Sequence, residues 1–371
     1  MEILRAKTLD LKQTGQLTPA RQANSQLNQQ EALAQKSQLQ SLPRRLVLEL
    51  TNRCNLNCLM CGRNSAQFIP TEFQLPWLQI FEPIIDYVEE VTLMGWGEPT
   101  IHPQFPQFLH WANQHGLRKY FCTNGMRLDA LFPTIIEEHA DIIAVSLDGA
   151  TAESNAAIRK GSDLNKITQS LQTLTNYKSQ HNLDYPYTNF VFTAMKQNLN
   201  QLPDMVKRTA ECGLDELKVV FLTAFDETLE KEALIDYIPQ IKETFSQAIQ
   251  EAERLHINLK LPYIPGEDPA GHQEHKTCYV GWRDFFLGSD GYVRPCMSTA
   301  EKLFSIEKYT TFEQMWNSPE YQTHREKVNT AKMNQSCKNC YQSSFANWNK
   351  RESFIQCGKT FSPQWCKEEK R

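Results

Sequence analysis

The chain has 371 residues, a formal net charge of −4 and 40% hydrophobic residues. This balance gives no electrostatic reason to expect binding to nucleic acid or to an anionic membrane surface. No stretch is apolar for long enough to span a bilayer, and the first residues, MEILRAKTLD, lack the apolar core of a signal peptide. We therefore expect a cytoplasmic protein of two domains, or of one large domain with an appendage.

Residues 13–40 are polar and rich in glutamine, with few apolar positions. This composition predicts an N-terminal extension, residues 1–43, that is helical or partly disordered and has no core of its own. Six short apolar runs then alternate with longer segments of helical pattern. The predicted strands are Arg45–Thr51, Val88–Gly95, Leu117–Asn124, Asp141–Leu147, Thr188–Met195 and Asp215–Leu222. The predicted helices between them include Leu75–Tyr87, Gln104–His115, Ile158–Ser179 and Leu202–Cys212.

Strands that alternate with helices predict an α/β fold with a parallel sheet. Six such units favour a partial (β/α)6 TIM-like barrel over an open sheet, with function on the loops after the strands. The pattern stops after Pro262, where IPGEDPAGHQEHK reads as a linker. We expect a core domain at 44–265 and a cysteine-rich domain at 266–371. His272 and His275 in the linker are interpreted as part of a solvated loop, with metal ligation as the alternative.

Three of the eleven cysteines lie in eight residues, at Cys54, Cys58 and Cys61, directly after the first predicted strand. In a reducing compartment, clustered cysteines bind metal or carry out redox chemistry more often than they form disulfides. A four-iron cluster held by three thiols keeps one iron open to another ligand. A zinc ion would need a fourth ligand, such as Cys122 or His102.

Three further stretches lie at the ends of later strands: GWGEP (95–99), CTNG (122–125) and SLDG (146–149). Together with CNLNCLMC and IRKG they resemble the motifs of radical S-adenosylmethionine (SAM) enzymes. The resemblance implies that Cys54, Cys58 and Cys61 hold a [4Fe-4S] cluster whose open iron binds SAM through its amino and carboxylate groups. An electron from this cluster would cleave SAM to methionine and a 5′-deoxyadenosyl radical, which takes a hydrogen atom from the substrate.

The same resemblance implies individual contacts to SAM. Gly97 and Glu98 match the motif that holds the amino group, and Trp96 stands where many members of the family have glycine. Arg159 is placed to pair with the carboxylate, because a guanidinium can do so with two hydrogen bonds. The alternative for Arg159 is an ordinary surface arginine on a helix.

Four other positions match less specifically. Met60 corresponds to a residue that packs on adenine, and its alternative is a methionine of the core. Ser146 and Asp148 fall where ribose contacts are expected. Asn124 is a weaker candidate for binding SAM, because Asn-Gly is also a plain turn sequence.

Two charged residues on predicted strands also need an explanation. A carboxylate in a buried strand is costly unless it is paired or used. We expect Glu49 to pair with an arginine such as Arg53, and the alternative is that it faces the pocket. Lys218 could face the substrate or extend outward to solvent.

The C-terminal region has a second set of cysteines. Alternating apolar residues around Asp290-Gly291 predict a β-hairpin between Cys278 and Cys296, and CKNC adds Cys337 and Cys340. Four thiols could bind zinc or an iron–sulfur cluster. The spacing resembles the auxiliary-cluster domains called SPASM and twitch. The longer SPASM pattern is incomplete after Cys340, which favours twitch with one auxiliary [4Fe-4S] cluster. The remaining C-terminal thiols, interpreted as ordinary cysteines, are Cys357 and Cys366.

The resemblance leaves two readings of the reaction open. The first is an oxidoreductase: a dehydrogenase that oxidises a small molecule, with the auxiliary cluster taking up an electron. The alternative is a maturase that crosslinks a ribosomally made peptide or forms a thioether in it, although 43 residues before the barrel are few for a leader-binding domain. Both would need an electron donor such as flavodoxin or ferredoxin. A non-catalytic iron–sulfur protein is the third and weakest reading.

Overall fold

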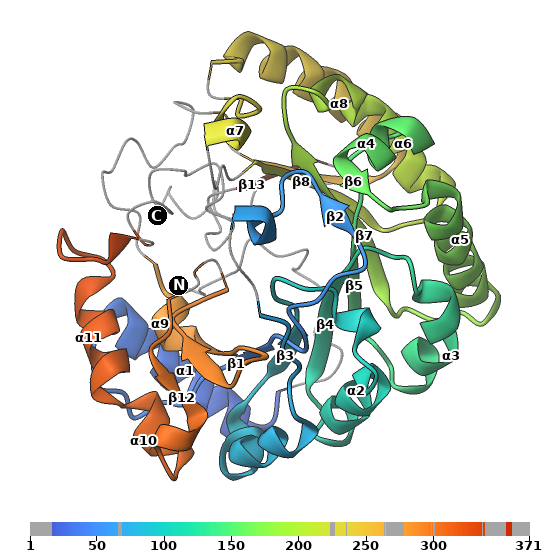
Figure 1. Ribbon diagram of the computed structural model, residues 1–371. Helices are drawn as coiled ribbons and strands as arrows, with labels where there is room; N and C mark the ends of the chain where they lie inside the picture. The colour runs from blue at the N-terminus through green and yellow to red at the C-terminus, as the bar shows by residue number, and fades with distance from the viewer. Residues whose placement is uncertain are drawn as a thin grey trace.

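A computed structural model describes residues 17–65, 69–222, 227–234, 236–262, 264, 278–297, 299, 301–335 and 337, and the backbone of 354–357. Its described strands form one eleven-stranded sheet in the order β12-β11-β10-β1-β3-β4-β5-β7-β8-β9-β13. All neighbours from β10 to β9 are parallel, and the pairs at both ends are antiparallel. Figure 1 shows that this sheet curves into an open barrel with helices on its outer side.

The strands of this sheet are β1 (Arg45–Leu48), β3 (Glu90–Leu93), β4 (Arg118–Thr123), β5 (Ile142–Ser146), β7 (Tyr187–Ala194), β8 (Glu216–Phe221), β9 (Asn258–Pro262), β10 (Asp284–Leu287), β11 (Tyr292–Arg294), β12 (Phe304–Ser305) and β13 (Phe354–Cys357). A separate pair joins β2 (Asn57–Cys58) to β6 (Arg159–Lys160). The six predicted strands are confirmed as the parallel neighbours β1, β3, β4, β5, β7 and β8. The fold is therefore the predicted α/β partial barrel, and the sheet is lengthened by β9 on one side and by strands of the C-terminal region.

The α-helices are α1 (Pro19–Leu33), α2 (Phe105–Gln114), α3 (Leu128–Glu137), α4 (Ala152–Ile158), α5 (Leu164–Gln180), α6 (Leu202–Glu211), α7 (Glu227–Glu230), α8 (Ile238–Leu255), α9 (Val280–Arg283), α10 (Phe312–Trp316) and α11 (Pro319–Lys327). The 3-10 helices are η1 (Gly62–Ser65), η2 (Leu75–Tyr87), η3 (Pro99–Ile101), η4 (Leu199–Gln201) and η5 (Ile306–Lys308). Apolar side chains from one face of β1, β3, β4, β5 and β7 to β12 pack against this outer layer and form one large core.

The prediction of one continuous helix over Ile158–Ser179 is wrong at its start. Ile158 ends α4, and Arg159 and Lys160 form β6. Gly161 then adopts a positive φ of 93°, which only glycine tolerates readily, and Asp163 caps the start of α5. The break matters for function because it places Arg159 on a strand beside Cys58.

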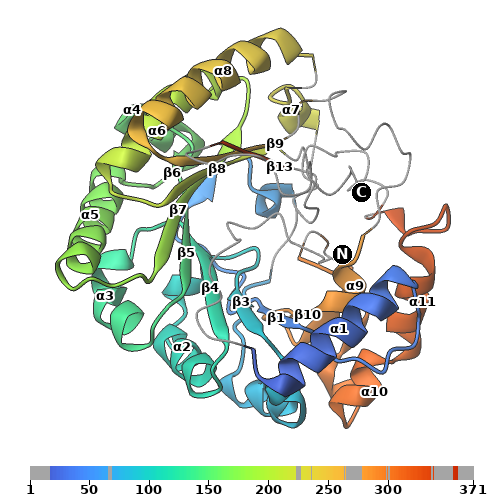
Figure 2. The ribbon, with the colours of Figure 1, turned by 180° about the vertical axis from the view of Figure 1, so that it is seen from behind.

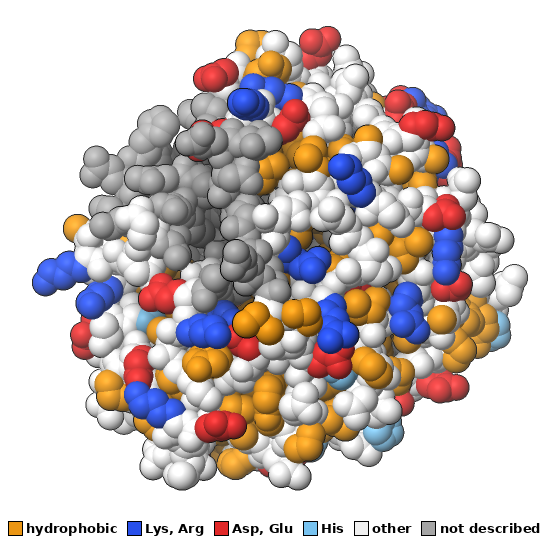
Figure 3. Space-filling model, viewed as in Figure 1, with side chains coloured by type: hydrophobic (Ala, Val, Ile, Leu, Met, Phe, Trp, Pro, Cys, Tyr) orange, Lys and Arg blue, Asp and Glu red, His pale blue; other side chains and the backbone are white. Residues whose placement is uncertain are grey.

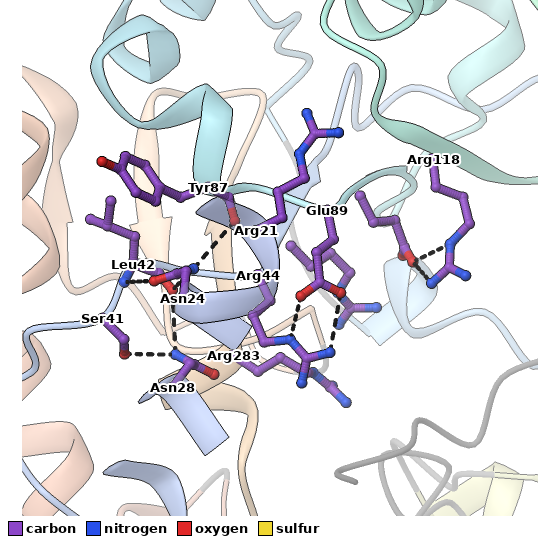
Figure 4. Close-up of polar contacts among 12 residues, drawn as sticks. Arg21, Asn24, Asn28, Ser41, Leu42, Arg44, Tyr87, Glu89, Arg118 and Arg283 are labelled. Atoms are coloured by element: carbon purple, nitrogen blue, oxygen red, sulfur yellow. Dashed lines mark hydrogen bonds and ion pairs between the residues drawn. The ribbon is translucent and has the colours of Figure 1, made fainter. Parts of the chain in front are cut away.

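The described part of the N-terminal extension contains helix α1 and packs on the core. Helix α1 lies against α9 and η2 on the side of the barrel that Figure 2 shows in front. Asn24 exchanges hydrogen bonds with the backbone of Leu42 and donates to the carbonyl of Tyr87, and Asn28 donates to Ser41 (Figure 4). Asn28 also donates to the carbonyl of Trp282 at 2.7 Å. The extension thereby connects the barrel to the C-terminal region.

The C-terminal region continues the barrel sheet. Strand β10 pairs in parallel with β1, and β11 returns antiparallel to β10, which confirms the predicted hairpin. Gly291 has a φ of 75° at its turn. At the opposite end of β10, Asp284 forms buried ion pairs with Arg45 of β1 and with its neighbour Arg283. The division into domains at residue 265 remains a prediction, while the sheet itself runs through both regions.

Candidate functional site

The loop of Cys54, Cys58 and Cys61 follows β1 and is held by the β2–β6 pair. This pair sets Cys58 opposite Arg159, whose Nη1 lies 3.8 Å from the Cys58 sulfur. The backbone N–H of Leu56 donates to the Cys54 sulfur at 3.4 Å, and Asn124 Nδ2 approaches the same sulfur at 4.0 Å. Hydrogen-bond donors and a cation thus surround two of the three sulfurs.

The chemistry of these donors fits thiolate ligands. Burial raises the pKa of the Cys54 thiol and raises that of Cys58 to about 11, so the free thiols are protonated at neutral pH. Donors aimed at sulfur stabilise the thiolate form that a metal cluster requires. In the part of the chain that the structure describes, no three His, Cys, Asp or Glu side chains are grouped for a single metal ion. In a four-iron cluster, each thiolate binds a different iron.

Glu98 of the GWGEP stretch is buried and joins the ends of two strands. One carboxylate oxygen accepts hydrogen bonds from the hydroxyls of Thr100 at 2.5 Å and Thr123 at 2.6 Å. The other oxygen accepts from the backbone N–H of Asn124 at 2.7 Å. Burial raises the pKa of Glu98, and these donors oppose that shift. Its contact with the SAM amino group stays a prediction.

Gly97 permits a close approach of two backbone segments. A Cβ at this position would lie 2.2 Å from the carbonyl oxygen of Thr51 and 2.3 Å from that of Arg53. The backbone N–H of Glu98 donates to the same Arg53 carbonyl at 2.8 Å. Gly97 therefore allows the GWGEP stretch to pack directly against the segment that precedes Cys54. The contact of Gly97 with SAM also stays a prediction.

Asp148 and Arg159 form a buried ion pair beside the cysteine loop. Asp148 Oδ2 lies 2.6 Å from Arg159 Nε, and its Oδ1 accepts from the backbone N–H of Thr193 at 2.6 Å. Burial disfavours the charged guanidinium, but Asp148 and then Cys58 raise the pKa of Arg159 above its ordinary value. Asp148 therefore orients Arg159 toward the Cys58 sulfur. The contacts of both residues with SAM stay predictions.

The remaining predicted SAM contacts lie around the same loop. Met60 packs against a small apolar cluster that contains Ile158 and Met195. The hydroxyl of Ser146 lies 3.5 Å from the sulfur of Cys122, and Asn124 donates to Asn55 of the cysteine loop at 2.8 Å. The fold thus brings all the residues predicted around SAM to the end of the barrel strands that carries the cysteine loop.

Two predictions about charged strand residues are resolved. Glu49 does not pair with Arg53, because Arg53 lies beside Glu72 at 3.8 Å. Glu49 instead accepts from the backbone N–H of Trp96 at 2.7 Å and from the hydroxyl of Ser289 at 3.0 Å. No local sequence signal could reveal this, since Ser289 is 240 positions away. Lys218 does not extend to solvent but is buried, and burial lowers its pKa to about 8.

The C-terminal cysteines are positioned by asparagines. Asn329 accepts from the backbone N–H of Cys278 at 2.7 Å and donates to its carbonyl at 3.1 Å. Asn334 accepts from the backbone N–H of Cys337 at 2.7 Å. Cys296 follows β11 and is partly buried. The predicted positions outside the described residues are Cys340, Cys366, His272, His275 and the side chain of Cys357.

Family models match both parts of the chain. Residues 48–209 match the radical SAM superfamily, and residues 278–341 match SPASM, described as an iron–sulfur cluster-binding domain. The chain belongs to the radical SAM superfamily. It is a radical SAM enzyme with a C-terminal SPASM-type domain, and its cofactors are a [4Fe-4S] cluster, SAM and an auxiliary iron–sulfur cluster. Within the described part of this radical SAM enzyme, every helix is too short or too polar to cross a membrane.

Known relatives cover most of the enzyme. The tungsten-containing aldehyde ferredoxin oxidoreductase cofactor-modifying protein of Pyrococcus furiosus is 26% identical over 281 residues, covering 71% of this chain and 74% of the relative. The PqqA peptide cyclase of Bradyrhizobium diazoefficiens is 26% identical over 318 residues, covering 81% of this chain and 79% of the relative. Streptococcus suis SuiB bound to SAM has a TM-score of 0.61 at 16% identity, covering 82% of this chain and 72% of SuiB. The similarity to SuiB shows a shared fold and nothing beyond it.

Proposed function

We propose that this radical SAM enzyme modifies a peptide, as a maturase that acts on a ribosomally made substrate. The observation that carries the proposal is the match to the PqqA peptide cyclase, which extends over both the core and the SPASM-type region. SuiB, which has the same fold, has also been crystallised with the precursor peptide SuiA. These relatives favour peptide modification over the oxidation of a small molecule by a dehydrogenase.

A small-molecule or cofactor substrate is the competing possibility. It is supported by the Pyrococcus furiosus relative, which is named for modifying a cofactor. Fold cannot decide between the two, because one barrel serves many substrates. The distinction has to come from the substrate itself.

The chain's own residues would act by binding and orientation. When bound, the cluster and SAM supply the radical that takes a hydrogen atom from the substrate. Cys54, Cys58 and Cys61 would hold the cluster at the rim of the barrel. Arg159, fixed by Asp148 at 2.6 Å, would hold negative charge next to Cys58. The buried barrel wall would exclude water from the reacting atoms.

The C-terminal cysteines would serve a second cluster. Cys278, Cys296, Cys337 and Cys340 would supply four thiolates, which leaves no open iron and suits electron transfer. Glu49 connects the two regions, since it accepts hydrogen bonds from both Trp96 and Ser289. An electron donor such as flavodoxin or ferredoxin would supply the electron for SAM cleavage.

The test uses the anaerobically reconstituted enzyme with SAM and a strong reductant. Separated peptide and small-molecule fractions of the native cell extract are added, and 5′-deoxyadenosine is quantified while peptide masses are followed. Stimulation by the peptide fraction, with a change in the mass of one peptide, is the expected result. Stimulation by the small-molecule fraction alone would overturn the proposal. A Cys58→Ala variant, carried through the same assay, controls for cleavage that does not depend on the enzyme.

A further inference from the structure

Glu49 lies directly after β1, the strand that joins the C-terminal region to the rest of the barrel. On one side β1 pairs with β3, which leads into the GWGEP stretch. On the other side it pairs with β10, which leads into the hairpin turn of residues 288–291. The backbone N–H of Glu49 donates to the carbonyl of Leu287, the last residue of β10, at 3.0 Å. Glu49 is therefore placed between two loops that are far apart in the sequence.

The carboxylate of Glu49 uses one oxygen for each of these loops. Its Oε1 accepts from the backbone N–H of Trp96 at 2.7 Å. Its Oε2 accepts from the backbone N–H of Ser289 at 3.2 Å and from the hydroxyl of the same serine at 3.0 Å. The Glu49 side chain lies so close to Gly95 that a Cβ there would be 2.4 Å from its Cγ. Three hydrogen bonds offset the cost of burying the carboxylate, and they fix the backbone of GWGEP relative to the hairpin turn.

Ser289 is also joined to the segment that precedes the cysteine loop. Its hydroxyl lies 2.8 Å from the hydroxyl of Thr71, and it accepts from Thr71 because it donates to Glu49. Asn52 accepts from the backbone N–H of Thr71 at 2.8 Å and donates its own backbone N–H to the carbonyl of Thr71 at 3.3 Å. Asn52 is two positions before Cys54. The hairpin turn of the C-terminal region thus contacts both stretches that are predicted to hold the cluster and SAM.

The bridge between Glu49 and Ser289 lies inside the protein. On the face of the molecule that Figure 3 shows, Lys and Arg side chains border the middle, mixed with apolar ones. Glu49 and Ser289 are only 3% and 2% exposed, so neither belongs to a surface that a substrate could contact. The bridge therefore acts through the backbone that it holds.

We propose that Glu49 is a positioning residue for SAM: joined to Ser289, it holds the backbone of GWGEP in the conformation that accepts the amino group of SAM. The proposal rests on the predicted contact of GWGEP with SAM and needs no assumption about the substrate. A carboxylate suits this role because its two oxygens serve two loops at once, whereas a glutamine has a single acceptor oxygen. The hairpin turn of the C-terminal region thereby completes the SAM site of the barrel.

The first test measures binding of S-adenosylhomocysteine, which has the amino and carboxylate groups of SAM but no sulfonium methyl group. Equilibrium dialysis is carried out anaerobically on the reconstituted enzyme. Glu49→Gln keeps the size of the side chain and should raise the Kd about tenfold, because it can accept from only one of the two loops. Ser289→Ala should raise it about threefold, since the backbone N–H of this residue remains. Ser305→Ala, the same substitution at a hydroxyl that caps η5, is the matched control and should bind as the wild type does.

The variants separate a positioning role from a general structural one. The double variant Glu49→Gln/Ser289→Ala should bind no more weakly than Glu49→Gln alone, because both changes remove the same bridge. Additive losses, or wild-type affinity in Glu49→Gln, would overturn the proposal. Iron content should equal that of the wild type in every variant. A loss of iron in Glu49→Gln would overturn it too, since Glu49 would then support the cysteine loop itself.

The second test examines the bridge in the wild-type enzyme, where no variant can fail to fold. If the bridge favours binding of the ligand, the ligand must favour the bridge by the same factor. Saturation with S-adenosylhomocysteine should therefore slow hydrogen exchange at the backbone N–H of Ser289 about tenfold. Mass spectrometry of peptides that contain this turn measures the rate, with peptides from α8 as the reference. Unchanged exchange at the turn would overturn the proposal. Neither test uses a substrate, so their failure is distinguishable from failure of the proposed peptide modification.

Discussion

The two cysteine sites of this enzyme are built in different ways. Cys54, Cys58 and Cys61 lie on one loop, and their surroundings include donors aimed at sulfur from Leu56 and Arg159. Of the C-terminal cysteines, Cys278 and Cys337 come from separate segments and are held through their backbone groups by Asn329 and Asn334. In the first site, hydrogen-bond donors contact the sulfur atoms directly. The second site depends on how segments that are distant in sequence pack together.

Because the two sites are built differently, different substitutions should disrupt them. The loop site fails if a ligand or its charged neighbour is lost. The C-terminal site also fails if the packing between α11 and its surroundings loosens. The following substitutions separate these two dependences.

The largest expected difference is between Cys58→Ala and Cys337→Ala. Cys58→Ala should abolish formation of 5′-deoxyadenosine, because the SAM-binding cluster loses a ligand. Cys337→Ala should retain SAM cleavage and lose product formation, with iron content lower by up to about four atoms per chain. Iron analysis and 5′-deoxyadenosine assays on both variants measure this. Equal loss of SAM cleavage in both would contradict two separate sites.

Arg159→Met should be the most destabilising substitution near the loop. It leaves the carboxylate of Asp148, which is fully buried, without its cation. Breaking a buried pair in this way costs about 3–5 kcal/mol of unfolding free energy. Arg254→Met removes an exposed pair with Glu251 and should cost less than about 1 kcal/mol. Anaerobic urea unfolding compares the two, and equal losses would show that the Asp148–Arg159 pair adds nothing.

The C-terminal region should respond to mild acid through His324 of α11. Burial, and then the neighbouring Arg325, lower the pKa of His324 to about 4. The unfolded chain therefore binds a proton between about pH 6.5 and 4 that the folded chain does not, so stability falls as pH falls through this window. The loss from pH 7 to pH 5 should be about 2 kcal/mol. His324→Gln should lack this part of the pH dependence in urea unfolding at the two pH values; an unchanged slope would rule His324 out.

The smallest expected effect is that of Asn329→Ala. It removes two hydrogen bonds to the backbone of Cys278 and should lower the unfolding free energy by about 1 kcal/mol. Iron content should fall partially, while 5′-deoxyadenosine formation without substrate stays at the wild-type level. Asn165→Ala, on the exposed face of α5, is the control. A fall in SAM cleavage would mean that the two sites are more tightly coupled than their packing indicates.

Much of the fold follows from local sequence patterns. The six parallel strands were predictable because apolar runs alternate with helical segments, and the hairpin at Asp290-Gly291 because its turn residues are specific. The loop cysteines were also predictable, since their spacing alone carries the information. The helix break at Arg159 was missed, because a helical pattern in sequence does not show that two residues pair with a distant strand.

The sequence by itself determined the barrel, the cysteine loop and the family, because each rests on residues close together in the chain. Only the tertiary structure decided that β10 joins β1, that Glu49 meets Ser289, and that Asp148 fixes Arg159. The same holds for the burial of Lys218, because only the assembled barrel removes its side chain from solvent. These contacts join residues far apart in the chain, and burial selects them only once the strands are assembled.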